Sequence, residues 1–332
     1  MSLFGRKPSE GRPTTLFFAA DVHGSDVTFR KFVNAARFYS ADALVFGGDL
    51  MGKALVPIIE QEGGTYRADH AGNPQTLQDG EALKAFQKQV ENVGFYWVIV
   101  EPEEYRALAE DRPALDRLFE KLARDRLASW VAFAQERLSG SGVRCYLTGG
   151  NDDAPAVLSV LDEATEEPIV PCEHRVVELD DEHTMITVGY STPTPWDTPR
   201  EATEEEIAAA IDASLANVPD PSRCVFNIHV PPIDSGLDRC IKLEASGDGP
   251  IPVTVAGHPL YFGAGSRSVL EAIREHQPVV GLHGHIHESP GRARYGRTQC
   301  FNPGSEYGQG ILRGLLVSIQ SGRLVGYQRT AG

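Results

Sequence analysis

The sequence has few cysteines, no long apolar run and fewer basic than acidic residues. Its five cysteines are far apart and include no C-x-x-C pair, which favours reduced thiols in a cytoplasmic protein over a disulfide framework. No stretch approaches the ~18–20 apolar residues of a membrane span, so we expect no membrane contact. The 31 basic and 46 acidic residues give a net charge of −15, which disfavours nucleic acid as a partner.

The bulk composition is that of a globular protein. The chain has 332 residues, of which 41% are hydrophobic and 23% charged, so it has ample apolar material for a large core. Residues 1–13 are polar, carry Gly and Pro, and lack the apolar centre of a secretory signal. We therefore expect a flexible tail over 1–13 and a single domain over 14–332.

Short buried strands alternate with amphipathic helices along most of the chain. The apolar run at 16–20 ends at Asp21, a helix is predicted over 25–39, and the run at 43–46 ends in Gly47-Gly48-Asp49. Because ligands in open α/β folds collect at the carboxyl ends of the strands, these acidic residues are candidate ligands. Further strands are predicted at 143–147, 184–188, 224–228 and 279–282, and a closing hairpin at 317–327.

Residues 57–142 interrupt this alternation of strands and helices and predict an inserted, mainly helical cap. A polar hairpin is expected over 65–77, and two or three helices follow. The clearest begins at Pro113, a favourable first helical residue, and ends before Gly140. The apolar run at 95–100 is expected to pack under the cap. A dimer surface, which would make the protein a homo-oligomer, and a substrate lid are the open alternatives.

Five short motifs, each closing an apolar run, supply side chains that bind metals. They read D-V-H from residue 21, G-G-D from 47, G-N-D from 150, a single His at 229, and G-H-I-H from 284. Carboxylate, amide and imidazole donors are the ligands of a catalytic transition-metal pair rather than of a thiolate zinc site. With one shared carboxylate, seven ligands make two four-ligand sites. The candidate ligands are Asp21, His23, Asp49, Asn151, His229, His285 and His287.

Each motif taken alone has a simpler interpretation. Asp21 is also consistent with a turn cap, Asn151 with an Asx-type turn, and His229 with a core histidine that is satisfied by hydrogen bonds. Their occurrence in one order, each after a buried run, favours the metal pair. Outside the motifs, we expect His183 to lie at the surface and His283 to be structural.

The order D-x-H, G-G-D, G-N, H, G-H-x-H resembles the calcineurin-like metallophosphoesterase superfamily, and in particular its prokaryotic-type predicted phosphoesterases. The resemblance runs from about Leu16 to Ser305, except the inserted cap, and the N-P-G-S sequence at 302–305 is also similar to the family pattern. It implies a four-layer α/β/β/α metallophosphoesterase sandwich with the metals at the strand ends.

The resemblance also implies a role for each ligand. Asp21, His23 and His287 are expected to hold one metal, Asn151, His229 and His285 the other, and Asp49 to bridge both. The cofactors are two divalent transition-metal ions, from among Mn, Fe, Zn, Ni and Co. The implied reaction is in-line attack of a bridging hydroxide on a small-molecule or nucleotide phosphodiester or phosphomonoester.

Two departures from the family pattern bear on the substrate. Many members carry His directly after the motif Asn, whereas this chain carries Asp152. Asp152 can act as leaving-group acid only if burial or a like charge raises its pKa, and the alternative is that it orients His229 or a water. We treat Asp152 and His229 as the candidate catalytic residues. The arginine that protein Ser/Thr phosphatases carry shortly after the residue equivalent to Asp49 is absent, which argues against a phosphoprotein substrate.

Other residues are weaker candidates for substrate contact. Ser266 and Arg267 begin a predicted helix whose N-terminus can bind a phosphate, or form an ordinary cap. His258 and Tyr190 lie in Gly- and Pro-rich loops, and Lys53 lies shortly after the G-G-D motif. The expected partner is a small phosphoester. A nuclease, or a non-catalytic scaffold for protein interactions, is the alternative function.

Overall fold

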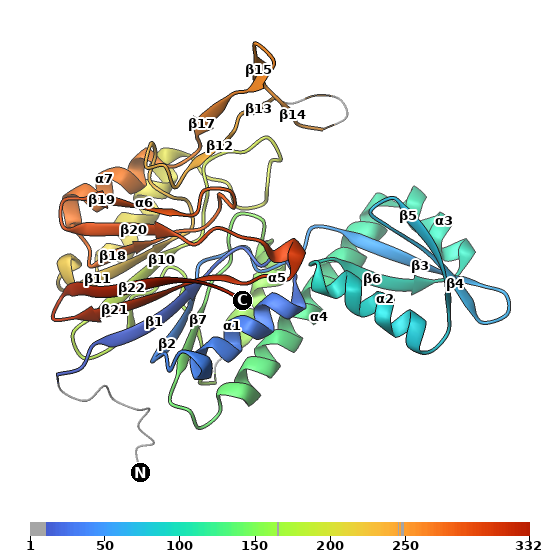
Figure 1. Ribbon diagram of the computed structural model, residues 1–332, viewed down its shortest axis with the longest axis horizontal. Helices are drawn as coiled ribbons and strands as arrows, with labels where there is room; N and C mark the ends of the chain where they lie inside the picture. The colour runs from blue at the N-terminus through green and yellow to red at the C-terminus, as the bar shows by residue number, and fades with distance from the viewer. Residues whose placement is uncertain (1–10, 165, 245, 247–248) are drawn as a thin grey trace.

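Two six-stranded sheets form the centre of the protein in the computed structural model, which describes residues 11–164, 166–244, 246 and 249–332 (Figure 1). The first sheet has the order β22-β21-β1-β2-β7-β8, and the second has the order β19-β20-β18-β11-β10-β9. Of the expected N-terminal tail, residues 1–10 lie outside the described residues. The first sheet contains β1 (Thr14–Ala19), β2 (Ala43–Phe46), β7 (Arg144–Leu147), β8 (Ile169–Pro171), β21 (Arg313–Gln320) and β22 (Arg323–Ala331). The second contains β9 (Val177–Glu178), β10 (Thr184–Val188), β11 (Cys224–Ile228), β18 (Val280–Leu282), β19 (Gly291–Tyr295) and β20 (Thr298–Asn302).

The sheets pack face to face, and helices cover both outer faces. Because side chains alternate along a strand, Leu16 and Phe18 of β1 face the second sheet and pack with Val225 and Leu282, whereas Phe17 faces the helices. The first sheet is covered by α1 (Asp26–Phe38), α4 (Arg112–Leu138) and α5 (Pro155–Glu163), and the second by α6 (Glu204–Leu215) and α7 (Arg267–His276). The predicted α/β/β/α sandwich is therefore confirmed.

The inner strands of both sheets are parallel. β1, β2 and β7 run together in the first sheet, and β10, β11 and β18 run together in the second. Parallel strands end at the same edge of a sheet, so the loops that follow β1, β2, β7, β11 and β18 are brought together. These are the loops that carry the five ligand motifs.

The inserted segment contains a sheet as well as helices. A four-stranded sheet of order β5-β4-β3-β6 packs on α2 and forms a lobe that projects from the sandwich (Figure 1). The expected hairpin at 65–77 is β4 and β5, but the run at 95–100 is a strand of the lobe, parallel to β3. The elements of the lobe are β3 (Leu55–Gln61), β4 (Thr65–His70), β5 (Asn73–Gln78), α2 (Glu81–Asn92), β6 (Tyr96–Val100) and α3 (Pro102–Glu110).

Helix α4 belongs to the main core rather than to the projecting lobe. The Trp130 side chain is fully buried, and its ring stacks on that of Phe29 in α1 with a centroid separation of 4.1 Å. Its indole Nε1 donates a hydrogen bond to Asp26 Oδ1 at 3.0 Å. The projecting part of the insertion therefore ends before α4, which corrects the expected boundary at residue 142.

His183 is buried, which corrects its expected surface position. Its Nδ1 donates to the Asp180 carboxylate at 2.8 Å, and its Nε2 accepts from the Gly322 backbone N–H at 3.0 Å. Asp180 also accepts a hydrogen bond from Thr14 at the start of β1. The pair thus ties both sheets to the C-terminal hairpin.

A second projection is built from short strand pairs between β11 and α7. We call it the arm (Figure 1), and it contains β12 (Arg239–Ile241), β13 (Leu243–Glu244), β14 (Ile251–Pro252), β15 (Thr254–Val255), β16 (His258–Pro259) and β17 (Tyr261–Gly263). Two 3-10 turns, Pro221–Arg223 and Tyr307–Gln309, complete the described elements. All five cysteines are free thiols. Among the described helices, none is both long and apolar enough to span a bilayer.

Candidate metal centre

The seven candidate ligands meet at the carboxyl ends of the inner strands. Each of the five ligand loops follows one strand, in the order β1, β2, β7, β11 and β18. Most of the side chains are buried, while that of His287 is 29% exposed. The structure therefore brings together residues that are as much as 266 positions apart in the sequence.

One group of donors is formed by Asp21, His23, Asp49 and His287, whose ligand atoms all lie within 4.8 Å of one another. The Nε2 atoms of His23 and His287 are 2.9 Å apart, and His23 Nε2 is 3.6 Å from Asp49 Oδ2. His287 Nε2 is 3.7 Å from Asp21 Oδ1. Donors that share one ion at ~2.1 Å stand roughly 3.0–3.4 Å apart. The separations of 2.9, 3.6 and 3.7 Å lie close to this range, so small side-chain movements would let the group hold a single metal ion.

A second group contains Asp49, His229 and His285, again within 4.8 Å of one another. His229 Nε2 lies 3.5 Å from Asp49 Oδ2 and 3.0 Å from Asn151 Oδ1. Asp49 is a member of both groups, which is the position expected of a bridging carboxylate. The donor set of oxygen and imidazole nitrogen suits a divalent transition metal.

Hydrogen bonds outside these groups fix how the ligands point. His229 Nδ1 donates to Gly47 O at 2.7 Å, which leaves the Nε2 lone pair free to bind a metal. Asn151 Nδ2 donates to Thr198 Oγ1 at 3.0 Å, so its Oδ1 is directed toward His229. Asn302 Nδ2 donates to the carbonyl of Ile286 at 2.8 Å and so fixes the loop of the last motif. These contacts preorganise the donors.

The backbone is strained at four of the ligands. Asp21, His23, Asp49 and His285 have φ of 58°, 39°, 58° and 68°, which is the left-handed region that non-glycine residues seldom adopt. Each such residue costs on the order of 1–3 kcal/mol, and residues of this kind cluster at functional sites. Strain at the ligands therefore supports a role for these residues beyond packing.

Glycines next to the ligands allow the loops to approach closely. A Cβ at Gly150 would lie 2.1 Å from Asp49 Oδ1, and a Cβ at Gly284 would lie 2.5 Å from Asp21 Oδ2. Both distances are too short for real atoms, so any larger residue would displace a ligand carboxylate. The glycines of the motifs are thus required by the geometry of the ligands.

Electrostatics in the cluster favour a cation beside the two carboxylates. Burial opposes ionisation of Asp49, but attraction to His229 outweighs it and holds the pKa of Asp49 well below its usual range. Burial likewise opposes protonation of His229, but Asp49 raises its pKa to about 9, so a metal that binds Nε2 must displace a proton there. Burial, reinforced by the His229 charge, lowers the pKa of His285 to about 4. Neutral His285 is thus ready to bind a metal near neutral pH.

Asp152 lies at the edge of the cluster, with 12% of its side chain exposed. Its carboxylate forms an ion pair with Lys53 and lies 3.5 Å from His23 Nδ1. Burial and the charge of Asp49 raise its pKa to about 6, although Lys53 opposes them. In the metal-free protein the pKa of Asp152 is thus shifted in the direction that an acid at this position needs, and the ring beside its carboxylate is that of His23.

The predicted phosphate contact at Ser266 and Arg267 differs from the structure. Ser266 is fully buried, caps α7, and donates its hydroxyl to Glu204 Oε2 at 2.6 Å. The Glu204 carboxylate also accepts from the backbone N–H groups of Arg267 at 2.8 Å and Ser268 at 3.0 Å. An internal carboxylate already occupies the anion-binding end of this helix, and neither Ser266 nor Arg267 lines the cavity at the metal ligands.

The other two predicted substrate contacts also lie elsewhere. His258 is an exposed residue of β16 in the arm. Tyr190 packs against the ring of His174 with a centroid separation of 5.4 Å, and the Arg200 guanidinium lies 5.2 Å from its ring centroid. Neither residue lines the cavity that opens at the metal ligands.

That cavity has a volume of about 950 Å³ and exposes residues that the sequence did not indicate. Besides ligands and Lys53, it is lined by Trp196, Phe262 and Tyr307. The Tyr307 ring centroid lies 4.8 Å from that of His23 and 5.9 Å from that of His287. These aromatic residues stand in irregular segments or the arm, where no periodic pattern or motif distinguishes them.

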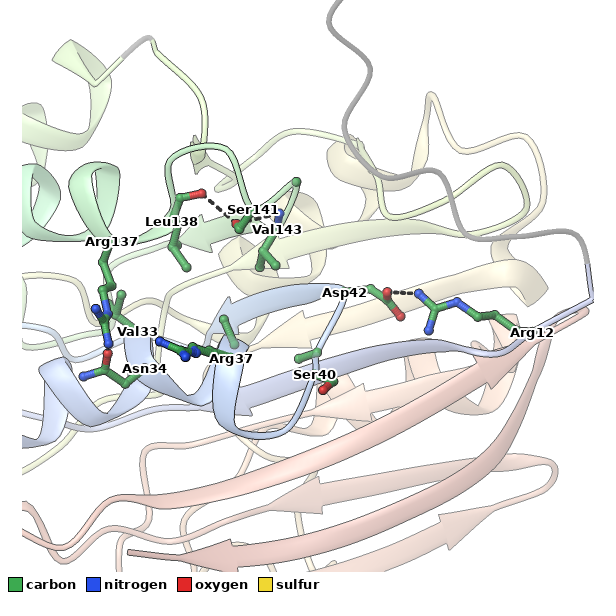
Figure 2. A pocket seen from close by; sticks show the side chains of 13 residues that line it. Arg12, Val33, Asn34, Arg37, Ser40, Asp42, Arg137, Leu138, Ser141 and Val143 are labelled. Atoms are coloured by element: carbon green, nitrogen blue, oxygen red, sulfur yellow. Dashed lines mark hydrogen bonds and ion pairs between the residues drawn. The ribbon is translucent and has the colours of Figure 1, made fainter.

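A smaller cavity of about 470 Å³ lies at the other end of the strands (Figure 2). It is lined by residues near the ends of α1 and α4, including Arg37 and Arg137, and by the ion pair of Arg12 with Asp42. Because β1 and β2 begin beside it, it is remote from the carboxyl ends that carry the ligands. It contains none of the predicted site residues.

No protein-family model and no curated protein matches the chain. Among solved structures, one matches 96% of this chain and 98% of its own with a TM-score of 0.56 at 17% identity. The protein TT1561 of Thermus thermophilus matches over the same shares with a TM-score of 0.52 at 12% identity. A dimetal phosphatase from Danio rerio also matches over these shares, with a TM-score of only 0.39 at 11% identity. At identities this low, the first two matches show a shared fold alone.

Proposed function

We propose that the protein is a metal-dependent phosphoester hydrolase of the calcineurin-like metallophosphoesterase type, because its fold and the order of its ligand motifs resemble those of that superfamily. The observation that carries the proposal is the convergence of seven ligand side chains into two groups that share Asp49. A binding module has no need of so many buried, strained and preorganised donors.

In this proposal the chain holds two divalent ions. Asp21, His23 and His287 would hold one, Asn151, His229 and His285 would hold the other, and Asp49 would be shared. When bound, the pair supplies an activated water and a positive field for a phosphate oxyanion. Mn, Fe, Zn, Ni and Co all suit this donor set, and availability decides among them.

The residues around the ions position the substrate and move a proton. Asp152, in its protonated form, donates a proton to the leaving oxygen, because its carboxyl lines the cavity beside the ligands. Lys53 is paired with Asp152 and stabilises the carboxylate that remains after this transfer. Tyr307 packs on the ring of His23 and limits the access of water to that side of the cluster.

Hydrolysis assays of two model esters test the proposal. The protein is chelated, Mn²⁺ is added back, and cleavage of bis-p-nitrophenyl phosphate is compared with cleavage of p-nitrophenyl phosphate. Restored cleavage of the diester marks a phosphodiesterase, and restored cleavage of the monoester marks a phosphomonoesterase. Failure to cleave either ester, with two ions bound per chain, would contradict the proposal and favour the scaffold alternative.

A matched pair of variants completes this test. Asp49→Asn should lower activity by ~100-fold or more, because it weakens both metal sites. Asp162→Asn should leave it unchanged, because that side chain is 73% exposed on α5 and remote from the ligands. Near-normal turnover by Asp49→Asn would refute the bridging role.

A further inference from the structure

The cavity at the metal ligands is much larger than a phosphate group requires. Its volume of about 950 Å³ is typical of sites that enclose a whole organic ligand. From Asp49, Asn151, His285 and His287 it extends between the 192–198 segment and the base of the arm. The space beyond the ligands is therefore available to the organic part of a substrate.

The walls of this space are apolar and aromatic. Trp196 is 60% exposed and Phe262 is 42% exposed, although both rings are large hydrophobic groups that favour burial. Pro193, Pro195 and Ile241 extend the same surface. A ligand with an aromatic or aliphatic group would remove this area from water, which is a favourable change in free energy.

The charges on the walls disfavour a second anionic group. Among the described residues that line the cavity, Lys53 is the one lysine or arginine, and its ammonium group already contacts the Asp152 carboxyl group. Glu204 and Glu288 add negative charge, and the Glu204 carboxylate is held by the N-terminus of α7. A polyphosphate or a nucleic-acid backbone needs several cationic contacts, and this surface does not offer them.

We propose that the substrate carries a single phosphate group on an apolar or aromatic body that packs against Trp196 and Phe262. The inference rests on the proposed function, since the phosphate is placed at the metal ligands. The apolar wall of the cavity indicates that the rest of the substrate is a ring or hydrocarbon chain without further charge. It separates such esters from nucleoside polyphosphates and nucleic acids.

Calorimetric titration of phosphonates tests this inference without requiring turnover. Benzylphosphonate, methylphosphonate and 3-phosphonopropionate are titrated into the full chain loaded with Mn²⁺. Benzylphosphonate should bind about tenfold more tightly than methylphosphonate, because it buries a ring on the wall. 3-Phosphonopropionate should bind no more tightly than methylphosphonate, because its carboxylate meets an apolar and acidic surface.

Three variants locate the effect on the wall. Trp196→Ala and Phe262→Ala should each lose most of the benzyl preference while binding methylphosphonate within twofold of the parent protein. Both side chains are exposed and lie outside the buried core, so the variants should fold. Tyr261→Ala is the matched control, since Tyr261 is an exposed aromatic neighbour in β17 that packs on Arg239 and does not line the cavity. It should keep the preference.

The outcomes separate this inference from the proposed function. Equal binding of benzyl- and methylphosphonate, or a preference that survives both wall variants, would overturn the inference. A clear benzyl preference in a protein that hydrolyses no phosphoester would support the assigned ligand class and contradict the catalytic proposal. Hydrolysis of model esters without a benzyl preference would support the catalytic proposal and contradict the assigned ligand class.

Discussion

Asp153 offers the sharpest test of how the fold builds the metal centre. Its carboxylate is fully buried and accepts hydrogen bonds from three backbone N–H groups, those of Leu50 at 2.9 Å, Met51 at 2.8 Å and Gly150 at 2.8 Å. The first two donors follow Asp49 directly, and the third precedes Asn151. One side chain therefore ties together two of the ligand loops.

The cost of removing this carboxylate follows from the donors that it leaves. Asp153→Ala leaves three buried N–H groups without partners, at ~1–3 kcal/mol each. Because water can enter the space and satisfy part of them, we expect a loss of about 3–5 kcal/mol in the free energy of unfolding. The loops that carry Asp49 and Asn151 lose their connection, so affinity for Mn²⁺ should fall by ~10–100-fold.

Urea denaturation and equilibrium dialysis measure the two effects on the same variants. Asp162→Ala is the control. Its exposed carboxylate forms a long, exposed ion pair with Arg175 at 3.9 Å, so its removal should change stability by less than ~0.5 kcal/mol. The reasoning is refuted if the free energy of unfolding of Asp153→Ala is within about 1 kcal/mol of that of the parent protein and its Mn²⁺ affinity is within twofold.

Other parts of the structure give three further predictions. Gly150→Ala should reduce Mn²⁺ affinity in dialysis by at least ~10-fold, because its Cβ would collide with Asp49, and unchanged affinity would contradict the close approach. Trp130→Ala should lower the free energy of unfolding by about 3–5 kcal/mol in urea denaturation, because it leaves a cavity beside Phe29. A loss below about 1 kcal/mol would place α4 outside the core. Burial opposes ionisation of Asp180, but its hydrogen bonds outweigh burial and lower its pKa to about 2. Its stabilisation is therefore present above the unfolded pKa of ~3.9 and is lost as pH falls through about 2. Asp180→Asn should remove about 1–2 kcal/mol, after allowance for solvent screening, at pH 6 but little at pH 2 in denaturation curves, and an equal loss at both would contradict the assignment.

Local patterns predicted the strands and the ligand loops that follow them, whereas the four-layer sandwich was implied by the family resemblance. A buried apolar run identifies a strand, and Asp21, Asp49 or His229 at its end identifies a ligand loop. Parallel strands then bring the loops together without further information. The sheet of the lobe was not predicted, because its strands have their own small core and pair residues that are far apart in the sequence, such as Ile58 with Ile99.

Contacts between distant segments explain the expectations that failed. The N-terminus of α7 is filled by Glu204, which lies 62 positions before Ser266 and carries no local sign of this role. His183 follows three acidic residues and looks solvated, yet the C-terminal hairpin covers it. Trp196 and Tyr307 enter the site through irregular loops. Cytoplasmic location and homo-oligomer formation stay predictions.

The central claim is that activity depends on two metal ions held by these seven ligands. The chelated protein is titrated with zero, one and two equivalents of Mn²⁺, and bound metal and hydrolysis of the better model ester are measured on the same samples. Two ions should bind per chain, and activity should rise mainly with the second. Full hydrolysis by the metal-free protein, or saturation of activity with less than one bound ion, would contradict the claim.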